Sequence, residues 1–167
     1  MKGKAQHEGL TTELARETLA SIVDPEIPAV TLVEMNIIRD VKVEDGSVHV
    51  VFSPTFVGCP ALDFMKQEIR ETLHSAGFRN VTIEVTFSPP WSTDMLDESV
   101  REKLRAFGIA PPPPTGESIP ATLLLPVSCP FCGSPDTHLE SRFGSTLCRQ
   151  IYYCDACQQS FDRFKPV

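Results

Sequence analysis

Apolar residues recur at helical spacing in three stretches of the chain. The spacing predicts a helix over 13–23, a second over 60–76, and a third that begins after Asp97 and ends before Gly108. Gly77 follows the second stretch, and glycine commonly ends a helix because it adopts left-handed backbone freely. The three apolar faces are formed by Ala15, Leu19, Ile22 and Val23, by Leu62, Met65, Ile69 and Leu73, and by Val100, Leu104 and Phe107.

Strict alternation of apolar and polar residues predicts strands between these helices. In the stretch IIRDVKVEDGSVHVVFSPT, two alternating segments flank Asp45-Gly46, a dipeptide that favours the tight turn of a β-hairpin. The stretch NVTIEVTF, residues 80–87, alternates in the same way and predicts a third strand. The predicted order is helix, strand, strand, helix, strand, helix, which is typical of a small α+β domain with helices packed on a sheet.

A run of prolines separates this predicted domain from the rest of the chain. The stretch APPPPTGESIPA cannot continue a helix or enter the interior of a sheet, so it predicts a stiff, extended linker. We therefore expect an α+β domain over 1–110, a proline-rich linker over 111–126 and a small C-terminal module over 127–167.

Composition and charge narrow the class of protein. Hydrophobic residues make up 41% of the 167 residues, which is enough for a packed core, and the formal net charge of −7 makes the chain a poor ligand for phosphate backbones. The N-terminal stretch MKGKAQHEGL contains no apolar signal-peptide segment, and no apolar run is long enough to cross a bilayer. We expect a cytoplasmic protein that binds neither nucleic acid nor membrane and keeps its six cysteines reduced.

Four of the six cysteines form two C-x-x-C pairs in the C-terminal module. Cys129 and Cys132 are separated from Cys154 and Cys157 by 21 residues, a spacing that lets two tight turns place four thiolates around one tetrahedral Zn²⁺. The module is too short to fold on core burial alone, so we expect a zinc ribbon that the metal stabilises. Rubredoxin-like iron, an iron–sulfur cluster, and four packed cysteines without metal are the alternatives for this set.

Acidic and basic residues balance in the C-terminal module, so the predicted ribbon lacks the basic face of a nucleic-acid binder and protein contact is the expected role. Cys148 lies outside the two C-x-x-C pairs. It is either a small hydrophobe of the ribbon or an accessory thiol beside the small-residue stretch FGST.

The sixth cysteine lies in the stretch TFVGCPAL, between a predicted strand and a predicted helix. Pro60 favours the first position of a helix, which places Cys59 at the N-cap, where backbone N–H groups and the helix dipole lower the pKa of a thiol. Thr55 is close enough in sequence to donate a hydrogen bond. We expect a nucleophile or a soft-metal ligand, and the alternative is a buried cysteine at a strand-to-helix corner.

Three stretches resemble the metal–sulfur cluster biosynthetic family, which includes SufT-like proteins and the eukaryotic cytosolic iron–sulfur targeting factor. They are DPEIPAVTLVEMNIIRDV, VHVVFSPTFVGCPAL and PPWSTDMLDESVREKLRAFGIAPP. When the C-terminal stretch SRFGSTLCRQIYYCDACQQSFDRFKP is included, the resemblance extends from about Leu14 to the end of the chain. It then narrows to the PaaD family of small accessory subunits encoded with the bacterial phenylacetyl-CoA epoxidase.

The resemblance assigns roles to four residues. The acids of the family's D-P-E motif are Asp24 and Glu26, and the T-x-x-x-C-P loop supplies Thr55 and the reactive Cys59. Taken without the resemblance, Asp24 is equally a helix terminator, and Glu26 is equally a solvated loop charge.

Two further positions complete the match to the family. Trp91 corresponds to a tryptophan after the last strand, and we expect it to pack rather than to take part in chemistry. Asn36 stands where family members often have glycine. Because asparagine tolerates left-handed backbone, we expect the turn to persist.

The resemblance implies an accessory protein of phenylacetate degradation, not an enzyme. It would mature or deliver an iron–sulfur or iron centre to the epoxidase system, with the reductase component as the expected client. Cys59 would be a transient ligand of iron or of a cluster, Thr55, Asp24 and Glu26 would tune its thiol, and the zinc ribbon would dock the client.

Two other functions remain open. One is a non-catalytic structural subunit of the epoxidase complex, and the weaker one is a cysteine-dependent enzyme. The chain has neither the pair of E-x-x-H motifs of a di-iron oxygenase nor the G-x-G-x-x-G motif of a flavin or nicotinamide subunit.

Overall fold

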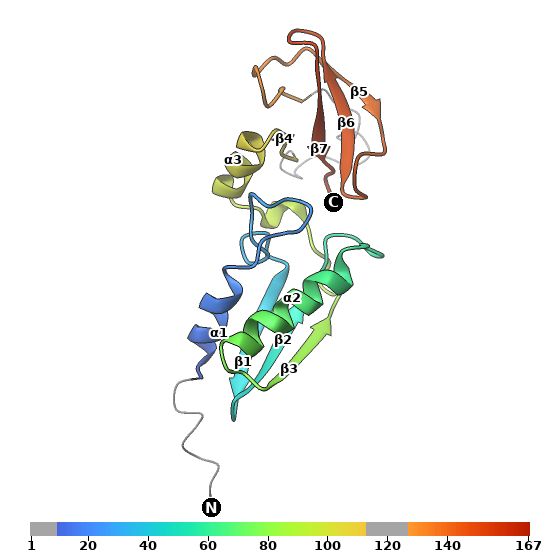
Figure 1. The fold of residues 1–167 in the computed structure, drawn as a ribbon. Coiled ribbons are helices and arrows are strands. Elements are labelled where there is room, and N and C mark those ends of the chain that lie inside the picture. Colours follow the sequence, from blue (N-terminus) through green and yellow to red (C-terminus); the bar gives the residue numbers. More distant parts are fainter. Residues whose placement is uncertain (1–9, 113–126) are drawn as a thin grey trace, which may run out of the picture. The chain divides into compact units, whose positions relative to one another are not determined.

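The computed structural model describes residues 10–112 and 127–167. The chain forms two units, Met1–Pro90 and Trp91–Val167, and each is described by itself (Figure 1). The mixed helix and strand composition confirms the expected α+β class. Of the expected linker, residues 113–126 lie outside the described part of the chain.

The first unit contains the predicted hairpin and two of the predicted helices. Its elements are α1 (Thr12–Leu19), β1 (Ile38–Glu44), β2 (Ser47–Phe52), α2 (Leu62–Ser75) and β3 (Asn80–Val85). β1 pairs with β2 antiparallel, and Asp45 and Gly46 form the turn with φ values of 47° and 75°, which confirms the hairpin. β3 pairs with β2 parallel, and α2 is the crossover between them.

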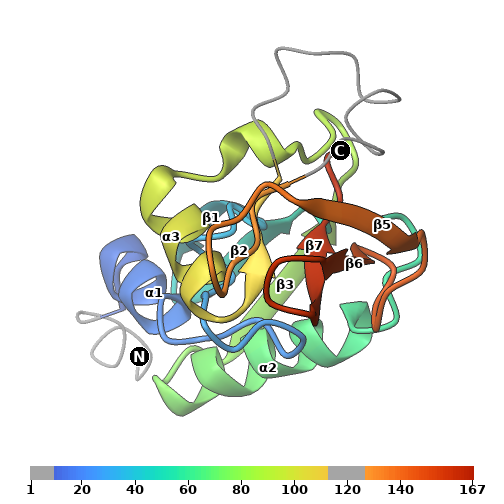
Figure 2. The same cartoon turned by 90° about the horizontal axis from the view of Figure 1, so that it is seen from above.

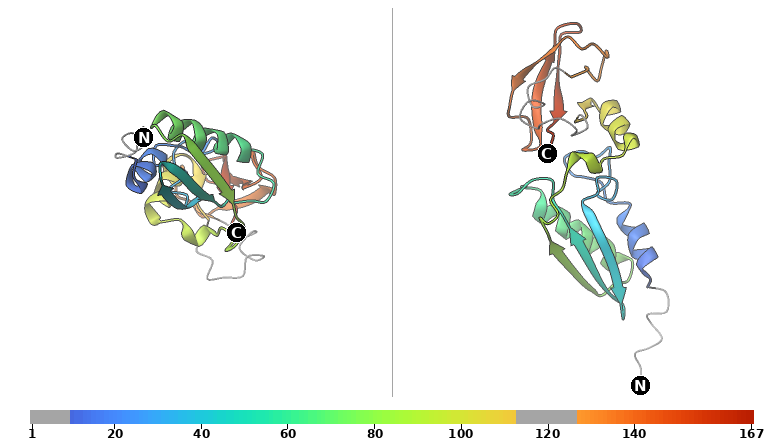
Figure 3. Two further views of the ribbon diagram at one scale, coloured as in Figure 1. Left: turned by 90° about the horizontal axis from the view of Figure 1, so that it is seen from below. Right: turned by 180° about the vertical axis from the view of Figure 1, so that it is seen from behind.

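The helices α1 and α2 lie side by side against one face of this sheet (Figures 2 and 3). The side chains that meet there are the predicted apolar faces, since the sheet contributes every second residue of β2. The buried residues of this interface include Ala15 and Leu19 of α1, Val48, Val50 and Phe52 of β2, and Met65, Ile69 and Leu73 of α2.

A long loop joins α1 to β1 and contains the D-P-E motif. The loop is closed by the backbone N–H of Asp24, which donates to the carbonyl of Val30 at 2.9 Å, and by an isolated bridge between Val23 and Thr31. Asn36 has a φ of 53°, so the left-handed turn that we expected at this position is present.

The second unit is built around a sheet of four strands. Its elements are a short 3-10 helix, η1 (Thr93–Met95), then α3 (Glu98–Ala106), β4 (Ile109–Ala110), β5 (Thr137–Ser141), β6 (Arg149–Cys154) and β7 (Gln159–Phe164). The strand order is β4-β7-β6-β5; β6 is antiparallel to β5 and β7, and β4 is parallel to β7. Asp97 occupies the N-cap of α3, as predicted, although its side chain makes no capping hydrogen bond.

The division between the two units lies before Trp91 and not at residue 110, where we expected the first domain to end. The segment after Pro90 belongs to the ribbon, because Ile109 and Ala110 pair with Asp162 and Arg163 of β7. The backbone N–H of Thr93 also donates to the carbonyl of Val167 at 3.0 Å. No helix within residues 10–112 and 127–167 has the length and apolar character needed to cross a membrane.

Candidate functional site

Cys59 lies in the loop between β2 and α2, at the carboxyl end of the parallel strand β2. Helix α2 begins at Leu62 and its N-cap is Ala61, so Cys59 precedes the cap instead of occupying it. Its carbonyl accepts a hydrogen bond from the N–H of Leu62 at 3.2 Å, and its side chain is half-buried. The N-terminal turn of α2 therefore still directs its first amides towards the cysteine.

The D-P-E loop brings two carboxylates close to this thiol. Glu26 and Asp24 both act on the Cys59 thiol through their charge, although they come from the loop between α1 and β1. The fold therefore brings the two acidic residues of the D-P-E motif within electrostatic range of the cysteine of the T-x-x-x-C-P loop.

The pKa of Cys59 is raised, which corrects our expectation of an activated thiol. Partial burial disfavours the thiolate, and the negative charges of Glu26 and Asp24 disfavour it further. The N–H groups of Ala61 and Leu62 donate to the sulfur and act in the opposite direction, as expected for a helix N-terminus, but they do not prevail. The resting thiol at neutral pH is protonated.

Asp24 also has a structural role in its own loop. Its Oδ1 accepts hydrogen bonds from the backbone N–H groups of Glu26 at 2.7 Å and of Ile27 at 3.0 Å. The side chain is buried, with 9% exposed, whereas Glu26 is only half-buried. Asp24 therefore holds the shape of the loop that presents Glu26.

Thr55 and Ser53 lie in the segment that leaves β2. Thr55 is half-buried, and among the described residues no hydrogen bond joins its hydroxyl to the Cys59 thiol. Ser53 is fully buried, and its hydroxyl has no hydrogen-bond partner within the described part of the chain. Sequence reasoning gave Ser53 no role, because a serine after a strand is ordinary and only burial distinguishes it.

The second candidate site is the cluster of four cysteines in the ribbon. The Sγ atoms of Cys129, Cys132, Cys154 and Cys157 all lie within 4.8 Å of one another. Cys129 is 3.7 Å from Cys157, and Cys132 is 3.6 Å from Cys154. Four Zn–S bonds of about 2.3 Å in tetrahedral geometry separate the sulfurs by about 3.8 Å, so these residues fit a tetrahedral thiolate site.

Local structure explains why these four sulfurs converge. The first pair lies on a turn closed by hydrogen bonds from the N–H of Gly133 to the carbonyl of Cys129 and from the N–H of Cys129 to the carbonyl of Ser134, both at 2.9 Å. Gly133 has a φ of 76°, a left-handed conformation that glycine adopts without strain. The second pair lies on the turn between β6 and β7, where the N–H of Gln158 donates to the carbonyl of Cys154 at 2.8 Å.

The metal-free thiols ionise unequally. Burial raises the pKa of Cys129, but the N–H groups of Cys132 and Phe131 donate to its sulfur, and the pKa falls to about 7. Burial and the neighbouring thiols of Cys132, Cys154 and Cys129 raise the pKa of Cys157 to about 12. A bound Zn²⁺ would hold all four as thiolates, because coordination deprotonates a thiol.

Cys148 is separate from this cluster. It is buried, with 7% exposed, and its sulfur lies 3.0 Å from the Thr146 hydroxyl. Its carbonyl accepts a hydrogen bond from the N–H of Lys165 at 2.8 Å. These contacts fit the interpretation of Cys148 as a small buried residue of the ribbon.

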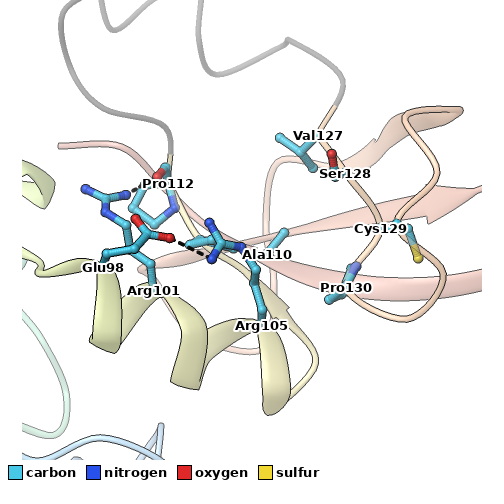
Figure 4. A pocket seen from close by; sticks show the side chains of 11 residues that line it. Glu98, Arg101, Arg105, Ala110, Pro112, Val127, Ser128, Cys129 and Pro130 are labelled. Carbon is cyan, nitrogen blue, oxygen red and sulfur yellow. Dashed lines mark hydrogen bonds and ion pairs between the residues drawn. The ribbon is translucent and has the colours of Figure 1, made fainter.

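The second unit also contains a pocket of about 630 Å³ between α3 and the first C-x-x-C turn (Figure 4). Arg101 on its wall donates to the carbonyls of Thr93, at 2.8 Å, and Pro112. Arg105 pairs with Glu98 at 2.8 Å. Pro112 and Val127, which border segment 113–126, both line the pocket, and we assign it no ligand.

Comparisons with known proteins relate this chain to one family. The family model described as the PaaD zinc beta ribbon domain matches residues 118–165, and the model described as an iron–sulfur cluster assembly protein matches residues 13–85. A protein of Escherichia coli K12 that is named as one of the subunits of 1,2-phenylacetyl-CoA epoxidase is 41% identical over 149 residues, which cover 89% of each chain. The chain belongs to the PaaD family.

Two further similarities each cover about half of this PaaD-family chain. An Fe-S protein maturation auxiliary factor of Porphyromonas gingivalis is 38% identical over 88 residues, which cover 52% of this chain and 83% of the relative. The crystal structure of a domain of unknown function from Bacillus anthracis superimposes with a TM-score of 0.52 at 20% identity, over 56% of this chain and 90% of that one. This last likeness shows the fold alone.

Proposed function

We propose that this protein is an accessory factor of phenylacetate degradation that delivers iron or an iron–sulfur cluster to the phenylacetyl-CoA epoxidase system. Its direct client is the iron–sulfur reductase component of that system. Cys59 is the transient ligand of the cargo, with Asp24, Glu26 and Thr55 around it. The ribbon holds one structural Zn²⁺ through its four clustered cysteines.

The observation that carries this proposal is the convergence of Glu26, Asp24 and Cys59. A carboxylate beside a thiol opposes the loss of the thiol proton, yet the same negative charge attracts a metal cation. When iron arrives, Cys59 releases its proton to solvent and binds through sulfur. Glu26, whose charge acts on Cys59 more than that of Asp24, would supply an oxygen donor, since Asp24 Oδ1 already accepts two backbone hydrogen bonds. A single half-buried thiol leaves most coordination positions open, so the cargo can leave again.

The names of relatives support this proposal. The Porphyromonas gingivalis relative is named for maturation of iron–sulfur proteins, and the Escherichia coli relative is named as an epoxidase subunit. An accessory protein that combines both domains fits a factor dedicated to that one enzyme system.

The test compares Cys59→Ala with Cys148→Ala in cells that express the epoxidase genes. Cys59→Ala should lower the iron and sulfide content of the purified reductase component, whereas Cys148→Ala should leave it unchanged. Equal iron and sulfide content in both strains would reject the delivery function.

The second candidate function is a structural subunit of the epoxidase complex. The name of the Escherichia coli relative and the protonated resting state of Cys59 favour it. In that case Cys59→Ala would leave the reductase fully loaded, and deletion of the whole protein would reduce the assembly of the epoxidase complex.

A further inference from the structure

The loop between β5 and β6, residues 142–148, presents apolar side chains to solvent. Phe143 is 80% exposed and Leu147 is 50% exposed. Exposure of a phenylalanine ring to water is unfavourable in free energy. A partner protein that covers the ring therefore gains binding free energy. The sequence RFGSTLC therefore has a feature that the zinc site and the Cys59 site do not explain.

The loop is held in one shape by backbone hydrogen bonds. The N–H of Gly144 donates to the carbonyl of Arg149 at 3.0 Å, and the N–H of Arg149 donates to the carbonyl of Thr146 at 3.1 Å. Ser141 accepts from the N–H of Phe143 at 3.1 Å and donates to its carbonyl at 2.9 Å. A Cβ at Gly144 would lie 2.8 Å from the backbone carbonyl carbon and 2.9 Å from the carbonyl oxygen of Arg149, so only glycine permits this close approach.

Side chains of β7 and of the residue that follows it, Lys165, contact the same loop. Asp162 pairs with Arg149 at 3.1 Å and accepts from the Ser145 hydroxyl at 3.3 Å. The Nζ atom of Lys165 donates to the carbonyl of Leu147 at 2.8 Å and lies 5.9 Å from the centre of the Phe143 ring. The loop thus displays its two apolar side chains from a fixed frame, which lowers the entropy lost on binding.

The charge around the loop is basic on an otherwise acidic chain. Residues 142–148 contain Arg142 and no acid, and Lys165 adds a second cation beside Phe143. Of the two acids beside the loop, Asp162 is paired with Arg149, and Glu140 accepts a hydrogen bond from the Ser160 hydroxyl at 3.2 Å. Since the whole chain has a net charge of −7, this local positive charge selects a partner surface with carboxylates.

We propose that residues 142–148 form the client-docking site of this protein. Phe143 and Leu147 enter an apolar pocket on the client protein, and carboxylates around that pocket pair with Arg142 and Lys165. This inference rests on the proposed function, because the client is the one to which Cys59 delivers its cargo. The loop supplies affinity and orientation, and Cys59 supplies the metal-binding chemistry.

The test measures binding of the full-length, zinc-loaded chain to the purified reductase component by calorimetry. Phe143→Ala should weaken the affinity at least about tenfold, as truncation of a central aromatic anchor does. Lys165→Glu should weaken it as well, and the wild-type affinity should fall as ionic strength rises. Phe107→Ala is the matched control, because Phe107 is also exposed, at 49%, but lies at the end of α3.

Three results would overturn the docking site. The first is that the wild-type chain does not bind the reductase component. The second is that Phe143→Ala binds it with the same affinity as wild type. The third is that Phe143→Ala changes nothing except that it abolishes self-association of this chain. One equivalent of zinc in each variant shows that the ribbon is intact.

Cys59→Ala separates this inference from the proposed function. If the docking site and the delivery function are both correct, Cys59→Ala binds the client normally but leaves it short of iron. Normal binding with a fully loaded client would reject delivery and leave the docking site standing. Normal affinity of Phe143→Ala, together with iron loss in Cys59→Ala, would reject the docking site alone.

Discussion

The indole of Trp91 packs against the ring of Phe164, with their centroids 5.9 Å apart and their planes at 51°. Trp91 is the first residue of the second unit, and Phe164 ends β7. Trp91 is 5% exposed, so it belongs to the core of the ribbon unit although more than thirty residues separate it from the first C-x-x-C pair.

Trp91 should therefore report on the zinc ribbon. It is the only tryptophan of the chain, and the core of the ribbon is too small to persist without metal. Removal of zinc with a chelator should shift the tryptophan fluorescence to longer wavelength as the indole meets water. An unchanged spectrum after complete zinc removal would show that Trp91 and the metal site fold independently.

Zinc content should depend on the four clustered cysteines only. Cys154→Ser removes a buried ligand, so the variant should lose the single equivalent of zinc found in wild type, and its ribbon should unfold. Cys148→Ser is the matched control, since serine can keep the contact to Thr146. Elemental analysis of the purified variants decides the point, and full zinc content in Cys154→Ser would contradict the assignment of the ligands.

The alkylation rate of Cys59 should respond to the charge of Glu26. The thiolate is the reactive form, so the raised pKa makes alkylation slow at neutral pH and faster as the pH rises. Glu26→Gln removes a negative charge that opposes ionisation, so the pH profile should move to lower pH and the rate at neutral pH should rise severalfold.

Glu17→Gln, an exposed residue of α1, is the control for this experiment and should leave the profile unchanged. Peptide mass mapping assigns the label to Cys59. A pH profile that moves to higher pH in Glu26→Gln would contradict the arrangement of the site.

The periodicity of apolar residues predicted every helix and strand of the first unit, because each of these elements buries one face against a neighbour. The end of that unit could not be predicted in the same way. The strand β4 has only two residues, and each pairs with a residue of β7 that lies 53 positions later in the chain. A strand of two residues is too short to show an alternating pattern, so its pairing with β7 leaves no signal in the sequence. The proline run was therefore the stronger indication of a domain boundary.

The candidate sites show the same contrast between local and distant determinants. The spacing of the C-x-x-C pairs was sufficient to predict that four sulfurs meet, since each pair lies on its own turn. At Cys59 the local motif predicted a lowered pKa, and the structure has a raised one. The burial of the thiol and the charges of Glu26 and Asp24 depend on the tertiary fold, which the TFVGCPAL motif does not contain.

Gly144→Ala tests whether the shape of residues 142–148 matters as well as their exposed side chains. The added methyl group would clash with Arg149, so the loop should shift and the variant should lose about 1–3 kcal/mol of stability. Its affinity for the client should fall although Phe143 and Leu147 are intact. Thermal unfolding and calorimetry measure the two effects, and wild-type values for both would show that the close approach is unimportant.

The central claim is that Cys59 passes iron or a cluster to the reductase component, and anaerobic reconstitution tests it most directly. The apo-reductase component is mixed with the wild-type chain or with Cys59→Ala, each supplied with iron and sulfide, and its iron and sulfide content is followed over time. Faster and fuller loading by wild type than by Cys59→Ala is the result that we predict. Equal rates and equal final content with the two proteins would contradict it.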